Sequence, residues 1–310
     1  MSDPELGESE AGAREAARPG TQSRVVDTRT PSGDLRSGGR LSLHSEVGGE
    51  GPPLLLLHGF TGSARSWDAH VERLQREYTT ICVDLPGHGR TEAPADVYAY
   101  TMDATIQSVC DALDAATTPV ASVLGYSMGG RVALRLALDK PERVSALILE
   151  SCSPGIDDPN ERRARMQSDE QLALSIERDG LQRFMDRWER LPLWLSQDSL
   201  PPDVRAELRR QRMTNRPIGL ANSLRGLGVG GQPALHNRIA ELNAPVLFIA
   251  GALDRKYVSA ARWMASAAPD SELAIVEDAG HAVHLERPER FDALTSAFLA
   301  SMSARARRRR

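Results

Sequence analysis

The sequence predicts an α/β fold, in which a mostly parallel β-sheet is flanked by helices and carries an inserted helical cap. Short apolar runs that suit buried parallel strands alternate with amphipathic helical stretches in both halves of the chain. Between the halves, residues 157–236 contain charged helical stretches and no good buried strand. With 310 residues, 41% of them hydrophobic, the chain can bury a large core.

The elements follow in order along the chain. Residues 1–37 are rich in Gly, Ser, Glu, Arg and Pro, and we expect them to form a disordered extension. A weak strand signal follows from Arg40, and a helical stretch with the spacing of Trp67, Val71 and Leu74 lies further along. Another helix is expected from Tyr100 to Leu113. Buried strands are expected at residues 53–57, 79–83, 120–124, 145–150, 245–250 and 273–276. These elements define a core of residues 38–156 and 237–303, a cap of residues 157–236 and a basic tail of residues 304–310.

The central motif lies where the strand of residues 120–124 meets a helix. Gly125-Tyr126-Ser127-Met128-Gly129 has the G-x-S-x-G pattern of a nucleophile elbow, in which glycines permit a tight turn that exposes the serine. A serine hydroxyl is inert by itself at neutral pH, so Ser127 requires a histidine base and an orienting carboxylate. The motif predicts both partners further along the chain.

Asp254 and His281 each lie just past an expected strand end, which gives the chain order Ser, Asp, His of α/β-hydrolases. We therefore predict a catalytic triad of Ser127, His281 and Asp254. His284 is a rival imidazole, but we expect it to face the following helix. Asp278 is a rival acid that lies too near His281 in sequence to reach its ring easily.

The loop after residues 53–57 begins His58-Gly59-Phe60, and in α/β-hydrolases this loop supplies an oxyanion donor. We predict that the backbone N–H groups of Phe60 and Met128 form the oxyanion hole. His58 is interpreted as a structural histidine. The later loop D-L-P-G-H-G falls short of a metal-ligand set, so neither a metal nor a cofactor is expected.

Charge and composition limit the classes of molecule that the protein is expected to bind. A net charge of -4 argues against a nucleic-acid-binding protein, and no apolar run is long enough for a membrane span. The arginine-rich end is interpreted as a solvated, disordered tail. Three cysteines without a metal or redox pattern, and an acidic start without a signal peptide, favour the cytoplasm.

Several motifs together resemble those of 2-succinyl-6-hydroxy-2,4-cyclohexadiene-1-carboxylate synthases, the menaquinone-pathway members of the α/β-hydrolase fold. They are H-G-F-T-G-S, V-D-L-P-G-H-G, G-Y-S-M-G-G-R, S-P-G, A-R-M-Q-S-D, G-A-L-D-R-K-Y and A-G-H-A-V-H-L-E. The resemblance implies a lyase whose triad acts as a base and eliminates pyruvate from a polycarboxylate cyclohexene. It also implies a substrate pocket formed by Arg131, Arg165, Arg212, Tyr126 and Trp188.

The sequence departs from this family in its long N-terminal extension, its arginine tail, Met128 in place of a commoner leucine, and a glycine-rich stretch in the cap. Two other functions therefore stay open. One is a carboxylesterase or C–C bond hydrolase that uses Ser127 as a nucleophile, and the other is a non-catalytic binding protein on the same fold. The arginines separate the first two, because a neutral ester needs none of them. The sequence leaves the oligomeric state open.

Overall fold

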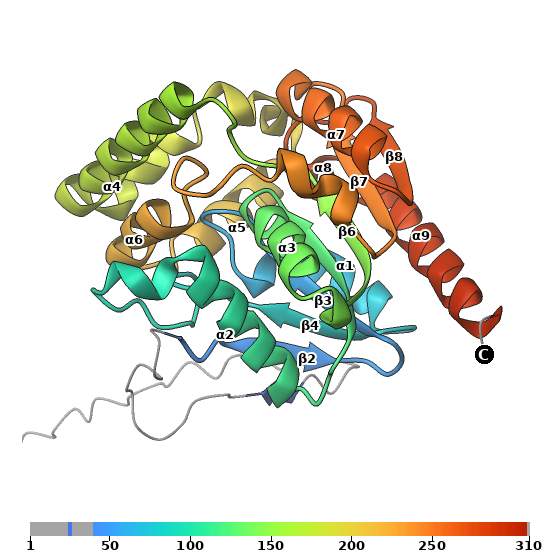
Figure 1. The fold of residues 1–310 in the computed structure, drawn as a ribbon. Helices are drawn as coiled ribbons and strands as arrows, with labels where there is room; N and C mark the ends of the chain where they lie inside the picture. Colours follow the sequence, from blue (N-terminus) through green and yellow to red (C-terminus); the bar gives the residue numbers. More distant parts are fainter. Residues whose placement is uncertain (1–23, 27–39, 309–310) are drawn as a thin grey trace, which may run out of the picture.

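The computed structural model describes residues 24–26 and 40–308. Its eight-stranded sheet has the order β1-β2-β4-β3-β5-β6-β7-β8, and only the pairings β1·β2 and β2·β4 are antiparallel (Figure 1). The α/β fold with a mostly parallel sheet is therefore confirmed. The strands are β1 (Arg24–Val26), β2 (Ser45–Gly48), β3 (Pro53–Leu57), β4 (Thr79–Val83), β5 (Ala121–Tyr126), β6 (Val144–Glu150), β7 (Val246–Gly251) and β8 (Ser271–Val276).

Helices cover both faces of this sheet, because apolar side chains project from both faces. Strand β3 is an example, since its successive side chains point to opposite faces. Leu55 and Leu57 join the core cluster beneath α2, α3 and α7, whereas Leu54 and Leu56 join the cluster beneath α1 and α9. Because both faces are buried, the central strands consist of continuous apolar runs. These helices are α1 (Asp68–Leu74), α2 (Met102–Ala115), α3 (Met128–Asp139), α7 (Arg255–Ala267), α8 (Val283–Glu286) and α9 (Pro288–Arg308).

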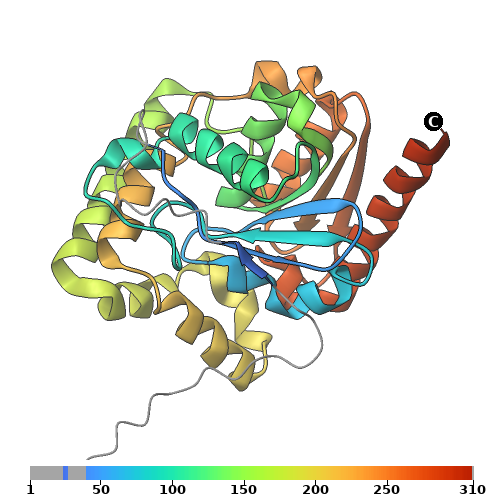
Figure 2. The ribbon, with the colours of Figure 1, turned by 90° about the horizontal axis from the view of Figure 1, so that it is seen from below.

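The segment between β6 and β7 contains helices and no β-strand. It contains α4 (Pro159–Trp188), a 3-10 helix at Pro192–Ser199, α5 (Pro202–Arg212) and α6 (Pro217–Leu227). α4 and α6 lie side by side at one end of the molecule, as Figures 1 and 2 show. They enclose a small core of their own, in which Ile176, Phe184 and Leu220 are buried. The exact limits of the cap at residues 157 and 236 stay a prediction.

Two expectations about the ends of the chain need correction. Within the extension of residues 1–37, Arg24–Val26 forms β1, which pairs with the edge strand β2; β-branched valines favour strands, and an unpaired edge accepts a further strand. The rest of that extension lies outside the described residues. The arginine tail was expected to be disordered, but α9 continues to Arg308 because Ala and Arg are good helix formers. Arg305 also forms an ion pair with Asp270 at 2.7 Å.

Candidate active site

Ser127 lies at the turn between β5 and α3 and has a strained backbone, with φ 51° and ψ -107°. The two flanking glycines are required by close packing. A Cβ on Gly125 would lie 2.5 Å from the carbonyl oxygen of Gly129, and a Cβ on Gly129 would lie 2.3 Å from that of Leu57. Strain of this kind persists only where the surroundings enforce it, and it is common at active sites. The G-x-S-x-G motif therefore has the geometry of a nucleophile elbow.

The structure brings together the three side chains of the predicted triad. His281 Nε2 lies 2.9 Å from Ser127 Oγ, and His281 Nδ1 lies 2.7 Å from Asp254 Oδ2. His281 is buried, and the aromatic rings of Tyr257 and Trp194 pack around it. In this arrangement Asp254 orients the imidazole, and the second ring nitrogen can accept the serine proton.

The two rival residues lie elsewhere. The Asp278 side chain is 84% exposed and faces Arg287 at 3.9 Å, so it does not reach His281. His284 was expected to face the following helix; its ring does approach Phe291 of α9, but its Nδ1 bonds to the carboxylate of Glu150 at 2.9 Å. The sequence did not reveal this pairing, because the two residues are 134 positions apart.

Two backbone N–H groups are available near Ser127. Met128 is the first residue of α3, so its N–H has no acceptor within the helix. Phe60 lies in the loop after β3, and among the described residues its N–H makes no backbone hydrogen bond. His58 is fully buried in this loop, where its Nδ1 faces the Gly59 carbonyl and its Nε2 accepts from Leu85 N–H. Burial lowers the pKa of His58 to about 4, so the ring is neutral and structural.

The loop D-L-P-G-H-G also has a structural role. Asp84 accepts hydrogen bonds from the backbone N–H groups of Ala64 and Arg90, at 2.6 and 2.8 Å. His88 accepts from the N–H of Thr61, which directly follows Phe60. Over the described ranges, no group of three or more His, Cys, Asp or Glu side chains could hold a metal ion.

A cavity of about 130 Å³ opens onto the triad. Its wall includes Ser127 and His281, and it also includes Arg131 from the elbow helix. Arg131 Nη1 donates to the Leu227 carbonyl at 2.8 Å, and the guanidinium forms no ion pair with any described residue. Burial lowers its pKa, because water is replaced by protein around the charge. A half-buried guanidinium without a carboxylate is suited to binding an anion.

The other predicted pocket residues divide into two groups. Tyr126, Trp188 and Arg165 line the cavity, whereas Arg212 does not. Arg212 lies behind the wall, 5.5 Å from the ring centre of Trp194, and its Nη1 pairs with Glu189 at 3.2 Å. The structure therefore does not place Arg212 where a ligand in this cavity would touch it.

Several further lining residues were not predicted from the sequence, among them Tyr257, Trp194 and Ser223. Tyr257 lies three positions after Asp254, in the first turn of α7, and its ring centre is 4.6 Å from that of His281. Its place in this turn could have identified it. Trp194 lies in the 3-10 helix Pro192–Ser199 of the cap, and no sequence pattern distinguishes a residue of the cavity wall from one of the cap core.

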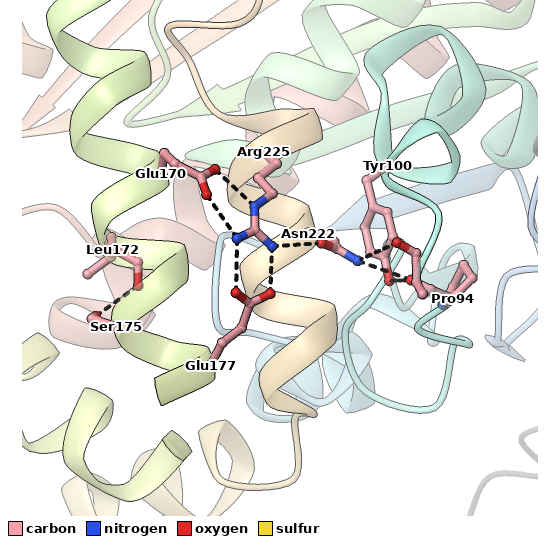
Figure 3. A network of polar contacts seen from close by, with 9 residues as sticks. Pro94, Tyr100, Glu170, Leu172, Ser175, Glu177, Asn222 and Arg225 are labelled. Carbon is pink, nitrogen blue, oxygen red and sulfur yellow. Dashed lines mark hydrogen bonds and ion pairs between the residues drawn. The ribbon is translucent and has the colours of Figure 1, made fainter. Parts of the chain in front are cut away.

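A polar network holds the cavity-lining helices of the cap in place (Figure 3). Arg225 of α6 donates to Glu170 and Glu177 of α4, with four contacts between 2.6 and 3.0 Å. Asn222, also on α6, donates to the carbonyl groups of Pro94 and Ala95 in the core. Together these contacts fix α6 to α4 on one side and to the core on the other.

The fold, the elbow and the order of the three residues define an α/β-hydrolase. The model of the alpha/beta hydrolase family matches residues 54–294, so this chain belongs to that family. It is 41% identical over 260 residues to a putative 2-succinyl-6-hydroxy-2,4-cyclohexadiene-1-carboxylate synthase of Bacillus subtilis, which covers 83% of this chain and 94% of the relative.

Two further similar proteins, an esterase and a protein of solved structure, have different names. A pimeloyl-[acyl-carrier protein] methyl ester esterase of Nitrosomonas europaea is 34% identical, over 81% of this chain and 96% of its own. The solved structure of MenH from S. aureus has a TM-score of 0.78 at 34% identity, over 81% of this chain and 94% of its own. The protein is accordingly an enzyme, either a lyase or a hydrolase. No helix in the described part of the chain is long and apolar enough to cross a membrane.

Proposed function

We propose that this protein is a lyase that eliminates pyruvate from a 2-succinyl-cyclohexene dicarboxylate intermediate and forms 2-succinyl-6-hydroxy-2,4-cyclohexadiene-1-carboxylate in menaquinone biosynthesis. The observation that carries the proposal is Arg131, a half-buried guanidinium without an ion pair among the described residues, in the cavity that opens onto Ser127. A substrate with several carboxylates would supply the missing anion. The relatives from B. subtilis and S. aureus support this choice.

In the proposed mechanism, the triad acts as a base. His281, oriented by Asp254, draws the proton from Ser127, and the serine oxygen removes a proton from the substrate. The electron pair of the broken C–H bond forms a ring double bond, and the C–O bond to the enolpyruvyl group breaks. The released enolpyruvate takes up a proton and becomes pyruvate. No acyl-enzyme forms and no water attacks.

The other residues would bind and stabilise the reacting groups. The backbone N–H groups of Phe60 and Met128 would stabilise the enolate-like oxygen that develops in the transition state. Arg131 and Arg165 would bind substrate carboxylates, since guanidinium forks match carboxylates in geometry. Tyr126 and Trp188 would form the wall around the ring. For Arg212 we retain only an indirect role, through its contact with Trp194.

A second function, ester hydrolysis with Ser127 as a nucleophile, is favoured by the similarity to the pimeloyl ester esterase and by the same triad geometry. We infer a cytoplasmic location from the three cysteines, all of them buried free thiols. This location rests on composition and is independent of the choice between lyase and esterase.

One experiment separates the two functions. The purified protein is incubated with the pyruvate-bearing cyclohexene intermediate and, in parallel, with a short-chain p-nitrophenyl ester. We expect rapid release of pyruvate, lost in Ser127→Ala by a factor of about 10³ or more, and feeble ester cleavage. Fast ester cleavage without pyruvate release would establish the hydrolase instead.

A further inference from the structure

Glu150, the last residue of β6, bonds to the backbone of Ser127 and to His284, which lies on the segment that carries His281. Its side chain is fully buried, and its backbone carbonyl accepts a hydrogen bond from the Ser127 N–H at 2.9 Å. Its carboxylate bonds to His284 twice, to the backbone N–H at 3.0 Å and to ring Nδ1 at 2.9 Å. One residue therefore joins the strained elbow to a second histidine.

His284 belongs to α8, three positions after His281, so the bond from Glu150 anchors the segment that carries the base. A second buried carboxylate, Glu286, holds the same segment from within, since it accepts from the N–H groups of Gly280 and Ala282. Glu286 fixes the shape of the loop. Glu150 fixes its position relative to the elbow, because it is the residue of β6 that bonds to both.

We propose that Glu150 and His284 are positioning residues that hold Ser127 and His281 at their reactive distance of 2.9 Å. This inference rests on the proposed triad but not on the identity of the substrate. A fully buried carboxylate and imidazole are costly unless they are paired, and Glu150 and His284 satisfy each other only in this arrangement of β6 and α8. A misplacement of 1 Å between reacting groups can reduce a rate by about 10²-fold.

The chain provides a matched control for this pair. His70 Nδ1 bonds to Asp292 Oδ1 at 2.6 Å, and the His70 side chain is 1% exposed, as is that of His284. This pair connects α1 to α9, and neither residue bonds to the elbow or to the loop of residues 280–282. The His70 ring packs edge-on against that of His284, with 6.0 Å between ring centres, so the control substitution is made at Asp292, which is 14% exposed. Loss of either pair removes a histidine–carboxylate contact, but only Glu150 also bonds to the elbow.

The test is the rate at which a phosphonofluoridate labels Ser127, a reaction that needs the serine and its base but no particular substrate. We expect Glu150→Gln to slow labelling by about 10- to 100-fold. Asp292→Asn should label within about twofold of the wild type, while circular dichroism verifies that both variants are folded. Labelling of Glu150→Gln at the wild-type rate, or equal slowing in both variants, would overturn the inference.

A second pair of variants covers the case in which Glu150→Gln does not fold. His284→Asn keeps an N–H donor near the position of Nδ1, whereas His284→Leu removes it. We expect normal labelling in the first and slow labelling in the second, and equal rates would contradict a positioning role. If the wild type is labelled but releases no pyruvate, the proposed lyase reaction fails while this inference is still tested.

Discussion

Asp169 binds the guanidinium of Arg165 through one nitrogen only, Nε. Arg165 Nε lies 2.8 Å from Asp169 Oδ1, while the other carboxylate oxygen, Oδ2, is buried without a hydrogen-bond partner among the described residues. The Arg165 side chain is 42% exposed and lines the cavity. Since Nε is occupied, the two terminal nitrogens remain for a ligand. Asp169 thus prepares Arg165 for bidentate binding of a carboxylate.

The first prediction concerns this pair. Asp169→Ala should raise KM for the cyclohexene substrate about tenfold with little change in kcat, because an unanchored arginine loses side-chain entropy on binding. In an Arg165→Ala background the same substitution should add almost nothing, as a double-mutant cycle would show. Asp169→Asn, which keeps the oxygen acceptor, is the milder control. Equal effects in both backgrounds would mean that Asp169 acts independently of Arg165.

The second prediction concerns Arg131. Arg131→Ala should reduce kcat/KM for the polycarboxylate by about 10- to 100-fold, since hydrogen bonds to charged groups contribute about 1.5–3 kcal/mol. Cleavage of a neutral p-nitrophenyl ester should change less than about threefold. Arg131→Lys keeps the charge without the fork and should be intermediate. If both substrates suffer equally, Arg131 serves the fold of the elbow helix rather than the anion.

The third prediction is a gain of stability at the cost of activity. Ser127 has φ 51°, a conformation that glycine adopts without strain. Ser127→Gly should therefore raise the free energy of unfolding by about 1 kcal/mol, measured by urea denaturation, and abolish turnover. Ser127→Ala keeps the Cβ and hence the strain, so its stability should match that of the wild type. A glycine variant no more stable than the alanine variant would show that the backbone relaxes here.

The sequence revealed those residues of the site that lie just after the end of a strand. Ser127, Asp254 and His281 each follow a strand that is recognisable as an apolar run, and the carboxyl ends of parallel strands meet at one edge. Arg212 could not be placed in this way, because its distance from the cavity depends on how α5 packs behind Trp194. Glu150 was hidden for a similar reason, since its partner His284 lies on the short helix α8, whose place in the fold no local pattern specifies.

The cap network supports a fourth prediction. Arg225→Ala removes the contacts to Glu170 and Glu177, and α4 should then open from α6 more often (Figure 3). Because both acids are partly exposed, we expect global stability to fall by only about 1 kcal/mol or less. Limited proteolysis within residues 157–200 should nevertheless become faster. Arg178→Ala, which removes a contact to Asp179 within α4 itself, is the control and should leave the cleavage rate unchanged.

The last prediction concerns pH. Burial lowers the pKa of His58 to about 4 and that of His88 to about 3, against 6.5 for an unperturbed histidine. Between pH 6.5 and 4 the unfolded chain binds protons at both positions, while the folded chain does not. Stability must therefore fall as the pH falls through this window, by up to about 1.4 kcal/mol per pH unit for each histidine.

His88→Gln provides the test of this pH dependence. Gln retains polar atoms for the contacts with the Pro86 carbonyl and the Thr61 N–H but does not titrate in this range. Urea denaturation at pH 4.5, 5.5 and 7.5 should show that the free energy of unfolding falls less steeply with falling pH than in the wild type. The difference in slope should equal the contribution of about one histidine. Above pH 7 the two proteins should run parallel, whatever their absolute stabilities. An identical slope in both below pH 6 would mean that His88 is protonated in the folded state, contrary to its burial.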